Sequence, residues 1–135
     1  MSRPDTTIAN AKVTLLRTPF LEQPQLSANF TRDREILVLE IETKAGHVGL
    51  GYQLFLRNGF RTVKTCLEEQ YLPQIIGRDA TEVEGIWNDL FRSSIADGRM
   101  GANLYAISAI DVALWDIVGQ AANLPLHRLW GTVKS

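Results

Sequence analysis

The sequence has little of what several classes of protein require. Its 135 residues include a single cysteine, Cys66, so no disulfide can form within the chain, as is typical of a reducing compartment. The net charge is −1 and no patch of lysine and arginine marks a nucleic-acid or anionic-lipid surface. No apolar run approaches the roughly 18 residues of a membrane span, and the N-terminus lacks a signal peptide's apolar segment. These absences predict a cytoplasmic protein that binds neither nucleic acid nor membrane.

The sequence also lacks the usual arrangements of catalytic side chains. The two histidines, His47 and His127, are far apart, and no set of Asp, Glu, His or Cys has the spacing of a metal site. The glycines at 46, 49 and 51 fall within a hairpin rather than at a strand-to-helix junction, so they form no phosphate-binding loop. No serine or cysteine triad is evident. We therefore expect no catalytic residue and no metal ligand in this chain.

What is present is the pattern of one soluble domain, with 45% hydrophobic and 21% charged residues. Alternating residues predict strands over 8–17, with Ala9, Ala11, Val13 and Leu15 on one face, and over 34–43. A short turn then leads into a third strand over 48–54, which makes a β-hairpin. Gly49 and Gly51 leave one face of that strand bare, which often marks the close approach of another backbone or of a ligand.

Residues 18–31 form a long connection without a clear period, and such connections are often lids or binding loops. It is more apolar than a solvated loop, since it carries Phe20, Leu21, Leu26 and Phe30. Two interpretations stay open: a loop folded back onto its own core, or a lid over an apolar group.

The second half predicts helices. Phe60, Val63, Leu67 and Tyr71 share a helical face, which Pro73 is expected to end. Residues 81–84, Thr-Glu-Val-Glu, have the form of a capping box at the start of a helix over about 83–91.

The longest predicted helix spans residues 102–122 and is apolar on nearly all sides. Its first face carries Ile107, Ile110, Leu114, Ile117 and Ala121; the opposite face carries Ser108, Asp111, Val112, Trp115 and Gly119. Because so small a domain cannot cover both faces, the second face predicts a further body: another domain or a second copy of the chain. Asp111 there needs a backbone N–H or an arginine as partner, or else acts as a catalytic acid or base.

A specific resemblance comes from residues 106–117, AISAIDVALWDI, continued by residues 119–121 and by LPLHRLWG at residues 124–131. With the hairpin at residues 46–52, Leu72-Pro73 and residues 76–79, they resemble the N-terminal domain of the mandelate racemase/muconate lactonizing enzyme family, within the enolase superfamily. The resemblance implies an α+β fold: a three-stranded antiparallel meander followed by a helical bundle. Residues 1–135 would be a single capping domain, with an ordered core over about 8–131.

In that family a (β/α) barrel follows, and it would begin here after about residue 132. The barrel supplies three carboxylate ligands for magnesium and the acid/base residues, often with a Lys-x-Lys pair, which remove a proton next to a carboxylate. The four lysines of this chain, at 12, 44, 64 and 134, include no such pair. The resemblance thus implies a parent racemase, dehydratase or cycloisomerase whose magnesium is bound by the absent barrel, and a chain that is inactive alone and binds no metal.

The family's two substrate-facing loops match residues 19–30 and the end of the hairpin. This makes six residues candidates to contact a carboxylate-bearing substrate: Phe20, Leu21, Leu26, Tyr52, Gln53 and Phe55. Many members have Gly-x-Gly-Glu where this chain has Gly49-Leu50-Gly51-Tyr52, and an aromatic residue there resembles the mandelate racemase-like branch. The resemblance also implies that Ser108, Asp111 and Trp115 meet the barrel.

Two alternatives differ in class from an enzyme fragment. The first is a free-standing interaction module that buries its second helical face in a homodimer or against a separate barrel chain. The second is a small binding protein that holds a hydrophobic ligand with the loop from Phe20 to Phe30. The uncovered helical face favours a homo-oligomer in the first case.

Overall fold

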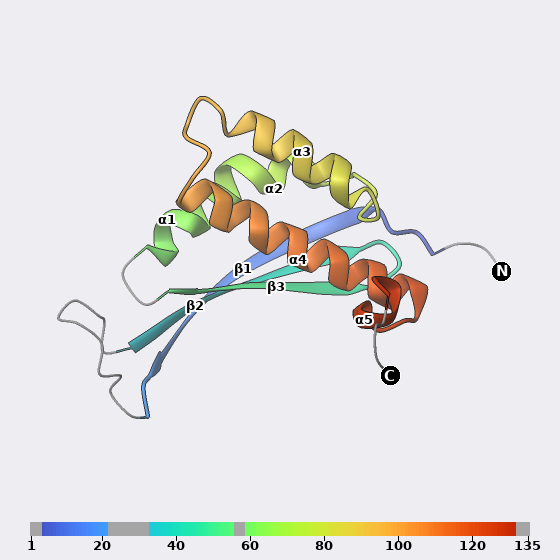
Figure 1. The fold of residues 1–135 in the computed structure, drawn as a ribbon, viewed down its shortest axis with the longest axis horizontal. Coiled ribbons are helices and arrows are strands. Elements are labelled where there is room, and N and C mark those ends of the chain that lie inside the picture. The colour runs from blue at the N-terminus through green and yellow to red at the C-terminus, as the bar shows by residue number, and fades with distance from the viewer. Residues whose placement is uncertain (1–3, 22–32, 56–58, 132–135) are drawn as a thin grey trace.

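In a computed structural model, the structure describes residues 4–21, 33–55 and 59–131. Three strands come first, followed by helices that lie on one side of the sheet (Figure 1). The strands are β1 (Ile8–Pro19), β2 (Asp33–Thr43) and β3 (Val48–Phe55), in the spatial order β1-β2-β3, and both pairs are antiparallel. The helices are α1 (Phe60–Thr65), η1 (Cys66–Tyr71), α2 (Leu72–Ile75), α3 (Val83–Ser93), α4 (Ala102–Ala122) and α5 (Leu126–Leu129). The predicted α+β meander with a helical layer is confirmed.

The inner face of the sheet forms half of the core. Leu37, Leu39 and Ile41 of β2 are fully buried beneath the helices, as their alternation predicts. In β1 the predicted face is wrong at Ala9: the pairing register shifts between Ile8 and Asn10, so that Ile8 is buried and Ala9 is exposed. A bulge of this kind adds one residue to the strand and moves the following side chains to the other face.

The two glycines of β3 bring α4 directly onto the sheet. A Cβ atom at Gly51 would overlap the carbonyl oxygen of Ala109, and one at Gly49 would lie 2.6 Å from Ile117 Cγ1. The close approach expected at these glycines is therefore made by another backbone, that of α4. The free edge of β3 is covered by the same helix, because Asp116 accepts a hydrogen bond from Leu50 N at 2.9 Å.

One continuous helical segment spans α1, η1 and α2, from Phe60 to Ile75. The expectation that Pro73 ends this helix is wrong, since the helix continues to Ile75. Pro73 lies in the first turn of α2, directly after the wider π-helical turn η1. At that position the missing proline N–H breaks no hydrogen bond of the regular α-helical ladder.

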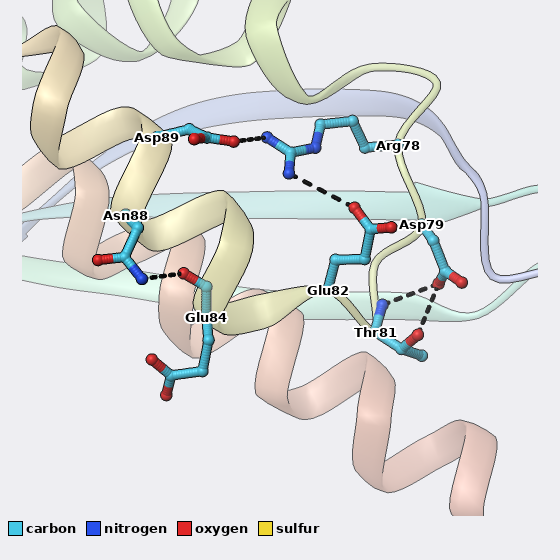
Figure 2. Close-up of polar contacts among 7 residues, drawn as sticks. All are labelled: Arg78, Asp79, Thr81, Glu82, Glu84, Asn88 and Asp89. Atoms are coloured by element: carbon cyan, nitrogen blue, oxygen red, sulfur yellow. Dashed lines mark hydrogen bonds and ion pairs between the residues drawn. The ribbon is translucent and has the colours of Figure 1, made fainter.

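The predicted capping box at residues 81–84 is also wrong. α3 begins at Val83 after Glu82, and among the described residues no side chain caps it. Thr81 donates instead from its N–H and its hydroxyl to Asp79 Oδ1, at 2.9 and 2.8 Å, and the Glu84 carboxylate points away from it (Figure 2). Asp79 prevails because a carboxylate two residues earlier can close a tight turn locally.

Helix α4 has the predicted bounds, and it crosses the middle of the domain between α3 and β3 (Figure 1). Ile107, Ile110, Leu114 and Ile117 are buried, as predicted for the first face. Contrary to the expectation from the sequence, α4 is long and apolar enough to cross a membrane by composition. Half of that stretch is buried inside this domain, and the core helix of a soluble protein passes the same test.

Candidate functional site

The candidate substrate residues of the first loop lie at the end of β1. Phe20 packs beneath the Arg34 guanidinium, whose carbon is 4.9 Å from the ring centroid, and Leu21 is fully exposed. Leu26 lies outside the described residues, as does Phe30. Pro19, the last residue of β1, pairs with Asp33, the first residue of β2, so Phe20 and Leu21 follow β1 at this end of the sheet.

The three candidates at the end of β3 lie on opposite faces of the sheet. Tyr52 is exposed on the outer face, away from the helices, whereas Gln53 and Phe55 lie on the inner face. Phe55 is buried and makes an edge-to-face contact with Tyr105 of α4, with ring centroids 5.6 Å apart. The structure therefore brings Gln53 and Phe55 together and separates Tyr52 from them.

Gln53 borders an open hollow of about 370 Å³ between the end of β3 and the start of α4. Tyr105, Leu104 and Ser108 of α4 form one side, and Met100 and Gly101 of the preceding loop form another. Ser108, a predicted barrel-contact residue, thus lies beside Gln53, a predicted substrate-contact residue. The hollow combines an apolar wall with amide and hydroxyl groups, which is the usual composition of a small-molecule pocket.

Trp115 and Asp111, the other two predicted interface residues, lie further along α4. Trp115 borders a second hollow of about 550 Å³ beside the first turn of α3. Its ring also makes an edge-to-face contact with Trp130, with ring centroids 5.3 Å apart. Both residues are half-buried. Partial burial, reinforced by the nearby Glu84 carboxylate, raises the pKa of Asp111. The carboxylate of α4 that accepts a backbone N–H is Asp116, which the sequence did not single out.

The sequence analysis missed an ion pair at the end of the sheet where β1 and β3 end and β2 begins. Arg17 Nη2 lies 2.5 Å from Glu35 Oε1, and Glu35 is only 1% exposed. The signal was available, because Glu35 stands in phase with the buried residues Leu37, Leu39 and Ile41. A charged residue in that phase has to be paired.

Within residues 4–21, 33–55 and 59–131, no group of three or more His, Cys, Asp or Glu side chains could hold a metal ion. The described residues therefore do not fit a magnesium ion. That the chain binds no metal stays a prediction.

Comparisons with known proteins agree with this fold. The family model for the mandelate racemase / muconate lactonizing enzyme N-terminal domain matches residues 7–131. A D-mannonate dehydratase of Rhizorhabdus wittichii is 43% identical over 100 residues, which are 73% of this chain and 24% of the relative. A cycloisomerase of Streptomyces coelicolor is 36% identical, over 73% of this chain and 27% of its own length. This chain thus spans about a quarter of the length of these curated relatives.

Solved structures give the same result. A racemase from Streptomyces coelicolor A3(2) with bound magnesium has a TM-score of 0.83 and 32% identity, over 92% of this chain and 35% of that one. An L-talarate dehydratase from Polaromonas sp. JS666, complexed with Mg and L-glucarate, has a TM-score of 0.81 and 30% identity. The match covers 95% of this chain and 33% of that one. The resemblance of the sequence is confirmed: the chain belongs to the mandelate racemase/muconate lactonizing enzyme family of the enolase superfamily, as an N-terminal domain.

Proposed function

We propose that this chain is the substrate-capping domain of a longer enzyme that removes a proton next to a carboxylate, as a dehydratase, racemase or cycloisomerase. The observation that carries the proposal is the common end of the sheet: the β1–β2 and β3–α1 connections both leave there, beside the hollow at Gln53. The relatives support the class of substrate, since they include enzymes of sugar acids, among them mannonate. The substrate would be a hydroxylated carboxylic acid.

In this proposal the chain excludes water and sets substrate preference, and the chemistry belongs to the rest of the enzyme. Phe20 and Leu21 would cover the substrate from the first connection, and Gln53 would offer its amide from β3. Closure of an apolar surface over a reacting carboxylate strengthens the electrostatic interactions inside the site. The chain alone would be inactive, and the parent enzyme's magnesium would be held outside it.

The exposed side of α4 would contact the barrel through Ser108, Asp111 and Trp115. These side chains are half-buried within the domain, so a further body can complete their burial. A raised pKa favours the neutral form of Asp111, which suits a carboxyl group at a domain interface.

The test is to follow the gene past the codon for Ser135 and to assay the product on D-mannonate and L-glucarate with magnesium. A continuous frame that encodes a barrel, with a Lys-x-Lys pair and three carboxylates, and turnover of a sugar acid are the expected results. Titration calorimetry of the 135-residue chain with magnesium is expected to give no heat of binding. A stoichiometric, tight metal site on this chain would contradict the proposal that the magnesium is held outside it.

A second candidate is a free-standing interaction module that forms a homodimer or pairs with a separate barrel chain in the cytoplasm. One observation favours it: the second face of α4 keeps large apolar side chains exposed, namely Tyr105 and Val112. Exposed apolar patches often mark protein–protein contacts. Light scattering of the 135-residue chain separates the two candidates: a discrete dimer and a stop codon after Ser135 would favour the module, whereas an orphaned capping domain would form soluble aggregates.

A further inference from the structure

The outer face of the sheet lies on the side away from the helices (Figure 1) and is rich in apolar side chains. Five large ones are exposed there: Leu16, Val48, Leu50, Tyr52 and Leu54. Two more, from β2, lie half-buried between them: Ile36 and Val38. An antiparallel sheet with one face in the core usually carries polar residues on its other face, because water solvates that face. The apolar outer face therefore indicates a contact with a further body.

Charged side chains stand at the two ends of this outer face. Arg34 is exposed near the start of β2, and Glu42 is exposed near its end. Glu40 also points outward, two residues before Glu42, and lies opposite Lys12 of β1 in the pairing register. The outward residues of β2 between Arg34 and Glu40 are apolar. The outer face thus has a cationic end, an apolar middle and an end where two carboxylates outnumber one lysine.

This distribution of charge is complementary to itself. A two-fold axis in the plane of the face, crossing the strands midway between Arg34 and Glu42, would stack each strand on its own copy in the opposite direction. Arg34 of one copy then lies opposite Glu42 of the other. Leu54 lies opposite Leu50, and Tyr52 lies near the axis. An axis parallel to the strands would instead bring like charges together at both ends, which is unfavourable. The charges therefore favour a second copy, stacked antiparallel.

The size of the outer face suits a weak dimer. From Arg34 to Glu42 it is about 27 Å long, at about 3.4 Å per residue, and three strands about 4.8 Å apart make it roughly 15 Å wide with their side chains. The corrugation of the side chains raises the accessible area to roughly 600 Å² per copy, which is the lower limit of specific interfaces. We therefore expect a Kd on the order of micromolar.

We propose that the outer face of the sheet binds a second copy of this chain face to face, with the β2 strands antiparallel and Arg34 of each copy beside Glu42 of the other. The helix α4 packs on the inner face of the sheet, so this dimer leaves the second face of α4 free for a barrel. The inference therefore does not depend on the proposed capping function, and it concerns a different surface.

The test measures Kd of the 135-residue chain by analytical ultracentrifugation. Every sample carries Val112→Lys, which places a charge on the exposed second face of α4 and so prevents association through that face. Leu54→Glu should raise Kd about 100-fold or more, because the two-fold axis buries the added charge twice. The matched control is Ile95→Glu, at a similarly exposed apolar residue just after α3, and it should leave Kd unchanged.

A charge exchange tests the antiparallel arrangement. Arg34→Glu alone and Glu42→Arg alone should each raise Kd about 10-fold, because each places like charges opposite each other at two symmetry-related points. The two substitutions together should bring Kd back to within about 3-fold of its value before the exchange, because opposite charges then face each other again.

A chain that stays monomeric at about 100 μM, well above the expected Kd, would overturn the inference. A Kd that Leu54→Glu leaves unchanged, or that the charge exchange does not restore, would overturn it as well. Circular dichroism checks that each variant is folded, and if Leu54→Glu is not, the charge exchange at the exposed ends of β2 decides. None of these measurements involves turnover or magnesium, so their outcome is separate from that of the capping function.

Discussion

The contact between β3 and α4 gives the sharpest quantitative prediction. A Cβ added at Gly51 would overlap the Ala109 carbonyl oxygen and would lie 2.9 Å from the carbonyl carbon and 3.3 Å from the α-carbon. Carbon atoms in contact are ordinarily about 3.5–4.0 Å apart. The obstacle is backbone on both sides, so no rotation of a side chain can relieve it. Gly51→Ala therefore requires α4 to move away from β3 by roughly 1 Å.

Such a shift affects much of the core, because α4 packs on β3 along its length. A gap of about 0.5–1 Å forfeits about a quarter to a half of each dispersion contact, and overpacking of a core usually costs about 1–3 kcal/mol or more. We expect Gly51→Ala to lower the free energy of unfolding by about 3 kcal/mol, out of roughly 5–15 kcal/mol for a domain. Urea titration followed by circular dichroism measures it.

The matched control is Gly85→Ala, in the first turn of α3. There the nearest atom to an added Cβ is Arg78 Nη2, at 3.6 Å, and alanine is the better helix former. The free energy of unfolding of that variant should rise by about 0.5–1 kcal/mol, because alanine has the higher helix propensity. The reasoning would be wrong if Gly51→Ala lowered the free energy of unfolding by less than Gly85→Ala raised it, because β3 and α4 would then not be in backbone contact.

Three further predictions concern single side chains. Asp116→Ala should lower the free energy of unfolding by about 1–2 kcal/mol and increase aggregation, because Leu50 N on the edge of β3 loses its acceptor; urea titration and light scattering measure both effects. Burial, with Glu84 nearby, raises the pKa of Asp111 above its ordinary value of 3.8. Because the folded chain then binds the proton more tightly than the unfolded chain, Asp111 contributes less to the free energy of unfolding as pH rises from about 3.8 through the raised pKa. Asp111→Asn should therefore be more stable than the parent chain at pH 7 and equal to it at pH 3. Burial also raises the pKa of the Cys66 thiol, so its alkylation at pH 8 should be slower than that of a free thiol, measured as a rate against pH.

Their contradicting outcomes are equally specific. Unchanged stability of Asp116→Ala would mean that water replaces the carboxylate at no cost. If the free energies of unfolding of Asp111→Asn and the parent chain differed by the same amount from pH 3 to pH 7, titration of Asp111 would not be the cause of the difference. Alkylation of Cys66 at the rate of glutathione would show that the helix opens on that timescale.

The sequence by itself determined the order and kind of the main elements. Alternation in β2 and the apolar pattern of α4 are local, periodic signals, and they predicted the burial of Leu37, Leu39 and Ile41 and of the first face of α4 at Ile107, Ile110, Leu114 and Ile117. Gly119, predicted on the second face, is buried within the domain as well. The glycines at 49 and 51 predicted a close approach, since only a missing side chain leaves room for it. The family, too, could be identified from the stretch at residues 106–117, and the match over residues 7–131 confirmed it.

Only the tertiary structure decided the features that depend on competing local partners. The residues 81–84 fit a capping box, but Asp79 is nearer to Thr81 and takes its hydrogen bonds. Pro73 signals a helix end, yet a π-helical turn before it lets the helix continue. In each case the sequence offered two allowed hydrogen-bond arrangements, and packing against the core selected one.

The same limit applies to the candidate site. Consecutive residues on a strand face opposite sides, so Tyr52 and Gln53, which the sequence analysis placed in one substrate-facing loop, lie on opposite faces of β3. The pairing of Arg17 with Glu35 depends on the register of β1 against β2, which the alternation within either strand does not set. A sequence lists which charges exist, but the sheet decides which of them meet, because the register alone sets the distances between strands.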